Sequence, residues 1–205
     1  MYGAARLVAE ADRFVRAGRW GKERMRPGLS LHRKTAGIVG MGRIGQAIAR
    51  RCAGLGMEVA WTGPRPKPDL PYAYVDSVLA LAERADVLIL ALAAGPGTER
   101  MVDAAVLRAL GPKGVLVNIA RGAVVEEAAL IAALHAGTIA GAGLDVFGTE
   151  PALDPRFLAL ENVVLAPHSA SITQETRAAL IARMLADIEA FRAGHSFLDA
   201  AAAAR

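Results

Sequence analysis

The chain has 205 residues, of which 54% are hydrophobic and 21% are charged, so it is long and apolar enough to bury a core. This composition excludes a disordered protein, and no apolar run reaches the roughly 18 residues that a membrane-crossing helix needs. The formal charge of +4 is compatible with a nucleic-acid partner. Many basic residues lie in 13–34, where only Phe14 and Trp20 could stack on bases, so we expect a solvated linker beside an anionic cofactor instead.

The first residues, MYGAARLVAEADRFVR, carry charges where a signal peptide would have an apolar core. Cys52 is the single cysteine, which rules out an internal disulfide, and its place in a helical pattern favours packing over nucleophilic chemistry. We therefore expect a cytoplasmic protein.

In chain order, residues 3–17 have the apolar spacing of one amphipathic helix, which ends at Gly18, and a polar linker follows over 18–34. From Thr35 onward, short continuous apolar runs alternate with segments of helical period. This alternation predicts a parallel sheet covered on both faces, which is a doubly wound α/β fold. The expected strands lie in 36–40, 57–62, 86–92, 114–120, 140–147 and 162–167, and the helices between them in 43–55, 77–84, 103–110 and 126–136.

A last helix is expected over 173–193, ending at Gly194. The low-complexity tail 199–205 is expected to fray. One face of the expected helix over 173–193 is apolar, with Ala178, Ile181, Leu185, Ile188 and Phe191.

Three glycines, Gly40, Gly42 and Gly45, follow the first strand and open a helix. In this arrangement the backbone can approach a pyrophosphate, and the helix N-terminus supplies partial positive charge. The pattern predicts a dinucleotide site that includes Arg43 and Ile44, and the alternative is a tight turn that binds nothing.

The end of the second strand favours NADP(H) over NAD(H). A protein that binds NAD usually has Asp or Glu at this position, where the carboxylate binds the ribose hydroxyls. This chain has Thr62 and Gly63 instead, followed by Arg65 and Lys67. A guanidinium can bind a 2′-phosphate through paired, charge-assisted hydrogen bonds.

The stretches GIVGMGRIGQ, LGPKGVLVNIARGAVVEEAAL, GAGLDVFGTEP, NVVLAPHSAS and TQETR occur in this order. Together they closely resemble the D-isomer-specific 2-hydroxyacid dehydrogenases. The resemblance implies a Rossmann-type domain over 35–168, preceded by an interdomain helix and linker over 1–34. It also implies that 169–205 form a helix returning to a second, substrate-binding domain, most of which this chain lacks.

The resemblance further implies a catalytic trio of Arg121, Glu150 and His168. His168 would exchange a proton with the substrate oxygen, Glu150 would orient the imidazole, and Arg121 would pair with the carboxylate of a 2-oxo acid. Asp145 would bind the nicotinamide carboxamide, and Ala120 would line the cofactor site. The nicotinamide itself would carry the hydride.

Within the family, the chain looks most like glyoxylate/hydroxypyruvate reductases, and the resemblance implies a homodimer. We expect cofactor binding to be intact but turnover to be weak or absent in this chain. Two alternatives stay open: a binding module that senses the NADP(H) redox state, and a nucleic-acid binder that uses the basic linker. No metal site is expected, and three further histidines are expected at the surface, His32, His135 and His195.

Overall fold

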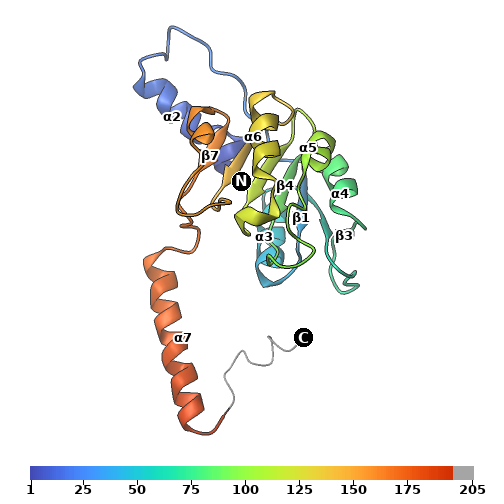
Figure 1. The fold of residues 1–205 in the computed structure, drawn as a ribbon, viewed down its shortest axis with the longest axis vertical. Coiled ribbons are helices and arrows are strands. Elements are labelled where there is room, and N and C mark those ends of the chain that lie inside the picture. The colour runs from blue at the N-terminus through green and yellow to red at the C-terminus, as the bar shows by residue number, and fades with distance from the viewer. Residues whose placement is uncertain (196–205) are drawn as a thin grey trace. The chain divides into compact units, whose positions relative to one another are not determined.

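The computed structural model describes residues 1–195. Within Met1–Pro167 the strands form one wholly parallel, seven-stranded sheet with the order β3-β2-β1-β4-β5-β6-β7 (Figure 1). This arrangement confirms the predicted Rossmann-type fold. The sequence did not predict β3, which has two residues and is too short to show periodicity. The strands are β1 Thr35–Val39, β2 Glu58–Thr62, β3 Ala73–Tyr74, β4 Val87–Leu90, β5 Val115–Asn118, β6 Gly141–Leu144 and β7 Val163–Leu165.

Both faces of the sheet are buried, as β4 shows. Leu88 and Leu90 belong to one core together with side chains of α4, α5 and α6, whereas Val87 and Ile89 belong to another with Ala4 and Cys52. Successive side chains of a strand point to opposite faces, so a strand covered on both sides has to be apolar throughout. The covering helices are α3 Arg43–Gly54, α4 Val78–Arg84, α5 Ala104–Leu110 and α6 Glu127–His135, with 3₁₀ turns η1 Gly122–Val124 and η2 Pro155–Ala159.

Side-chain caps explain where several helices begin. Ser77 accepts a hydrogen bond from the Ala80 amide at the start of α4, and Asp103 accepts from the amides of Ala105 and Val106 at the start of α5. Such bonds satisfy amides that have no partner inside the helix. They also lower the pKa of Asp103, chiefly through the Val106 amide.

The prediction of one helix over 3–17 was wrong. The structure has α1 at Tyr2–Ala5 and α2 at Val8–Arg16, separated by Leu7 in the left-handed region with φ 56°. Ala4 and Ala5 are buried, and a Cβ added at Gly143 of β6 would lie 3.5 Å from the Ala4 Cβ. The chain changes direction at Leu7 because α1 packs closely on the sheet, whereas Val8 and Val15 of α2 are half exposed.

A second compact unit begins at His168 and contains α7, Gln174–Arg192. Thr173 caps this helix by accepting a hydrogen bond from the Thr176 amide. The apolar face expected from the sequence is exposed within this unit, as Ile181 at 59% and Phe191 at 64% show. The predicted domain boundaries at 34/35 and 168/169 stay predictions, and the tail 199–205 lies outside the described residues.

Among residues 1–195, no helix is both long and apolar enough to cross a membrane.

Candidate functional site

The glycine turn connects β1 to α3. In the sheet it lies beside the end of β4, the neighbour of β1, at the point where the strand order reverses. Ligands of open α/β sheets bind at such a switch point. Gly40 has φ 93°, and an added Cβ there would lie 2.8 Å from the Ala91 carbonyl oxygen, so β4 leaves no room for a side chain. Gly42 is the N-cap of α3 and faces open space. Gly45 is buried below the turn, where a Cβ would overlap the Gly40 carbonyl oxygen.

A cavity of about 760 Å³ opens on one side of this turn. Gly40 and Gly42 line it together with Thr62, Gly63 and Arg65, so the structure brings these predicted cofactor residues together. The polar or charged side chains that line it are Thr62, Arg65, Lys67, Asp76, Ser77 and Thr98.

Hydrogen bonds hold the rim of this cavity in place. The Lys67 ammonium donates to the Met41 carbonyl in the glycine turn at 2.9 Å. The Tyr74 hydroxyl donates to the Gly63 carbonyl at 3.0 Å, and the Tyr74 ring meets Trp61 edge-on. The loop after β2, which carries Arg65, is therefore attached both to the glycine turn and to β3.

A neighbouring cavity of about 470 Å³ is lined by Gly42, Arg43 and Ile44 on one side and by Ala120 and Arg121 on the other. The two cavities share Gly42 and the residues that follow β4, 91–93. Both lie at the carboxyl edge of the sheet, with Arg65 and Lys67 lining the larger cavity and Arg43 and Arg121 lining the smaller one. Gly42, the N-cap of α3, lines both cavities, so the N-terminal amides of α3 lie beside them, and such a helix end favours binding of a phosphate.

Asn118 at the end of β5 shapes the turn that presents Arg121. Its amide nitrogen donates to the Arg121 carbonyl and its oxygen accepts from the Ala120 amide, both at 3.0 Å. Asn118 is 1% exposed, so these bonds satisfy a buried polar group. The sequence analysis missed Asn118, although a polar residue at the end of an apolar strand was a usable signal.

Asp145 and Glu150 lie on the segment that follows β6. Asp145 is buried, and its amide donates to the Asn118 carbonyl at 3.0 Å. Glu150 is exposed, and its Oε1 accepts from the Phe147 amide at 2.8 Å. Among the described residues that line the two cavities, neither Asp145 nor Glu150 occurs.

His168 is the first residue of the second unit and has φ 51°. A left-handed conformation is uncommon for a residue other than glycine and is often found at functional sites. The proximity of His168 to Arg121 and Glu150 stays a prediction. His32, His135 and His195 are exposed, as expected of surface groups.

Cys52 packs in the core, where burial raises the pKa of its thiol. No group of three metal-ligating side chains occurs within residues 1–195.

Residues 1–170 match the model of the NAD-binding domain of the D-isomer specific 2-hydroxyacid dehydrogenases. The chain belongs to this family. This confirms the resemblance read from the five motifs.

Among curated relatives, a 2-ketogluconate reductase of Gluconobacter oxydans is 50% identical over 177 residues, which are 86% of this chain and 57% of the relative. A glyoxylate/hydroxypyruvate reductase A of Arabidopsis thaliana is 42% identical over 94% of this chain and 62% of its own length. The chain therefore spans about three fifths of the length of these curated relatives.

Among solved structures, an NADPH-dependent glyoxylate/hydroxypyruvate reductase of Sinorhizobium meliloti in complex with NADP and malonate has a TM-score of 0.86. It is 42% identical, and the match covers 93% of this chain and 60% of that chain. The fold and the NAD(P)-binding character of the domain are thus those of the dehydrogenase family.

Proposed function

We propose that this chain is the nucleotide-binding part of an NADP(H)-dependent 2-hydroxyacid dehydrogenase that transfers a hydride between the nicotinamide and a small 2-oxo acid. The observation that carries the proposal is the pair of cavities at the carboxyl edge of the sheet, which share Gly42 of the glycine turn and of which the smaller is lined by Arg121. The named relatives act as reductases of glyoxylate, hydroxypyruvate or 2-ketogluconate. We propose a glyoxylate/hydroxypyruvate reductase-like activity within this class.

Three side chains share the chemistry in this proposal. Arg121 pairs with the substrate carboxylate and polarises the carbonyl that accepts the hydride. His168 gives a proton to the resulting oxygen, and Glu150 fixes the tautomer of the imidazole and favours its protonated form. The nicotinamide supplies the hydride when it is bound.

The remaining assignments concern the cofactor. Gly40, Gly42, Arg43 and Ile44 hold the pyrophosphate, and Gly45 lets α3 pack under the turn. Asp145 binds the carboxamide, and Ala120 lines the nicotinamide end.

The preference for NADP(H) rests on the charges at the rim of the larger cavity. Arg65 and Lys67 line it, and Gly63 stands where a carboxylate would repel a 2′-phosphate. Asp76 also lines this cavity, at the start of α4. A relative with 42% identity was solved with NADP bound.

The same proposal includes a cytoplasmic homodimer. The residues that contribute most to interfaces are often Trp, and Trp20 is 78% exposed in the segment between α2 and β1. Val8 and Val15 on α2 are also about half exposed.

Two measurements test the function. Fluorescence titration of this chain compares the affinities for NADPH and NADH. NADPH oxidation with glyoxylate, hydroxypyruvate or 2-ketogluconate is then followed in a version extended by the segment that its relatives have in addition. An extended chain that binds NADPH but reduces none of the three acids would refute the proposal.

A second candidate function is an NADP(H)-binding or redox-sensing module with weak or no catalysis. It is favoured by the match of residues 1–170 to an NAD-binding domain and by the cavity beside the glycine turn. It predicts a protein partner whose affinity differs between NADP⁺ and NADPH. Partner binding that is insensitive to both forms would contradict it.

A further inference from the structure

Asp76 is an acidic residue in the larger cavity, where the other charged side chains among the described residues are the basic Arg65 and Lys67. It lies two residues after the end of β3 and directly before Ser77, which caps α4. A carboxylate beside the expected site of an anionic phosphate is repelled by it, so it needs a different group of the ligand to contact. Neither the family motifs nor the site described above gives Asp76 a role.

The pairing of β3 with β2 places Asp76 at the carboxyl edge of the sheet. Tyr74 is the register partner of Trp61, and the Val75 amide donates to the Trp61 carbonyl at 2.8 Å. The next residue, Asp76, therefore lies beside the loop that follows β2. The bond from the Tyr74 hydroxyl to the Gly63 carbonyl joins the same two segments, so the sheet fixes where the carboxylate enters the cavity.

Asp76 and Arg65 line one cavity without pairing. Among residues 1–195, the side chain of neither makes a hydrogen bond or an ion pair, whereas Lys67 donates to the Met41 carbonyl. Opposite charges that share a cavity but do not bond each other are free to bind different groups of one ligand. Arg65 is proposed to bind the 2′-phosphate, which leaves Asp76 for a group that donates hydrogen bonds.

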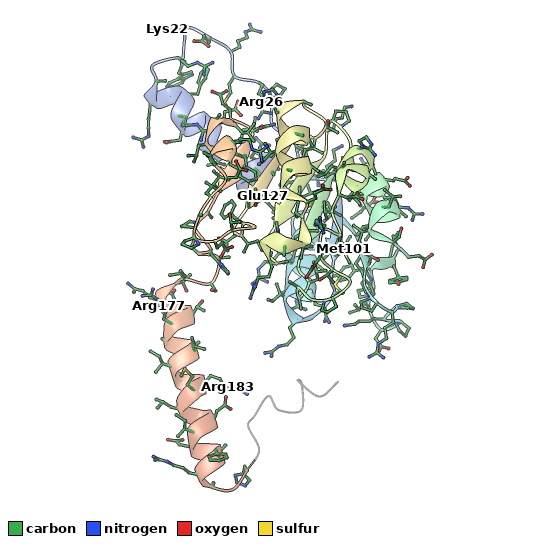
Figure 2. The ribbon with its side chains drawn as sticks, in the orientation of Figure 1. Lys22, Arg26, Met101, Glu127, Arg177 and Arg183 are labelled. Carbon is green, nitrogen blue, oxygen red and sulfur yellow. The ribbon has the colours of Figure 1, made fainter. Side chains whose placement is uncertain are left out.

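The same cavity has an apolar wall. Three half-buried side chains, Val78, Leu92 and Met101, line it and pack against the hydrophobic core. Figure 2 labels Met101, which lies on the connection between β4 and α5. A flat aromatic ring can bury its faces against such a surface while its polar edge meets a few polar groups. Val78 is two residues from Asp76, so the carboxylate and the apolar wall belong to the same part of the cavity.

Adenine is the part of a nicotinamide dinucleotide that fits both features, because its ring is flat and its exocyclic amine is a hydrogen-bond donor. We propose that Asp76 accepts a hydrogen bond from this amine and so selects adenine over a base that carries a carbonyl oxygen in its place. The inference rests on the proposed function, because it assumes that the larger cavity holds the adenosine end of NADP(H).

The test follows the fluorescence of the reduced nicotinamide while this chain is titrated with NADPH or with its deaminated form, in which hypoxanthine replaces adenine. Hypoxanthine has a carbonyl oxygen where adenine has the amine, and a carboxylate and a carbonyl oxygen that face each other repel. The wild-type chain should bind NADPH about tenfold more tightly than the deaminated form, the factor expected for one hydrogen bond to a charged group.

Two variants and one control assign this preference to Asp76. Asp76→Ala should weaken NADPH binding by about tenfold without weakening binding of the deaminated form, because only the amine loses its partner. Asp76→Asn should bind the two forms within about threefold of each other, since an amide can accept from the amine or donate to the carbonyl. Asp69→Asn is the matched control and should keep the wild-type preference, because Asp69 is exposed between β2 and β3 and does not line the cavity.

The outcomes separate this inference from the proposed function. Equal affinities of the wild-type chain for NADPH and its deaminated form would overturn the role of Asp76 and leave the nucleotide site intact. A gain in NADPH affinity in Asp76→Ala, with none for NADH, would place the carboxylate beside the 2′-phosphate and would also overturn it. Equal changes in Asp69→Asn and Asp76→Asn would show a general effect of charge, with the same consequence. A wild-type chain that binds neither NADPH nor NADH would refute the proposed function and this inference together.

Discussion

Replacing Gly45 by alanine tests whether the glycine turn is as tightly built as the structure shows. Gly45 is buried in α3, and a Cβ there would overlap the Gly40 carbonyl oxygen. Either the helix or the turn must move, and overpacking of this kind costs about 1–3 kcal/mol. The higher helix propensity of alanine offsets about 1 kcal/mol of this cost. Because the overlap involves backbone that cannot rotate away, we expect the upper end of the range and a net loss of about 2 kcal/mol.

Gly54→Ala is the matched control in the same helix. An added Cβ at Gly54 meets no atom within 4 Å. The control is therefore expected to be neutral or to gain about 0.5 kcal/mol, because alanine restricts the unfolded chain.

Thermal unfolding followed by circular dichroism measures the difference. For a chain of this size, 1 kcal/mol corresponds to about 2–4 °C, so Gly45→Ala should lower Tm by roughly 4–8 °C. The displaced turn should also weaken NADPH binding by about tenfold, which is the loss of about 1.4 kcal/mol. If Gly45→Ala matched Gly54→Ala in both Tm and NADPH affinity, the tight packing of the turn would be refuted.

Four other predictions test the cofactor rim, the proposed dimer, the core and the buried thiol. Arg65→Ala should weaken NADPH binding by about 10- to 100-fold in fluorescence titrations and leave NADH within about twofold; equal losses for both would argue against a 2′-phosphate site. Trp20→Ala should raise the dimer dissociation constant by about 30-fold in light-scattering measurements, the loss of about 2 kcal/mol typical of a central anchor, and an unchanged dimer would exclude Trp20 from the interface. Leu107→Ala, at a fully buried position, should lower the free energy of unfolding in urea by about 2–5 kcal/mol; a loss below about 1 kcal/mol would contradict its place in the core. Cys52 should react with a thiol reagent at pH 8 only after unfolding, because it is 0% exposed and burial also raises the pKa of its thiol, and rapid labelling of the folded chain would show that it is accessible.

Local patterns in the sequence were enough to predict the sheet and most of its helices. Strands such as β4 are apolar at every position because both faces are covered, and that property is visible without knowledge of any neighbour. Ser77, Asp103 and Thr173 cap helices through amides two or three residues away, so the starts of those helices could also be read locally. The glycine turn is local as well, and for that reason its position was predictable.

Other features depend on residues that are distant in the chain. The break at Leu7 exists because α1 packs closely on β6, and the short β3 exists because β2 offers it an edge. The spacing of apolar residues over 3–17 and 73–74 does not depend on these neighbours, so it could not predict the break or the short strand.

The candidate site also combines features that local sequence predicts with features that depend on distant residues. The types and order of Arg121, Glu150 and His168 could be read from the motifs, but the turn that presents Arg121 depends on the buried Asn118. The loop that presents Glu150 depends on Glu127, whose carboxylate accepts from the Gly148 amide, 21 residues later in the chain. The sequence by itself determined which elements form, because these follow from short-range spacing, and its motifs implied, through the family resemblance, which residues would take part in the proposed hydride chemistry. Only the tertiary structure decided which carboxylate holds which amide, because such a bond forms only when packing brings two distant segments within 3 Å of each other.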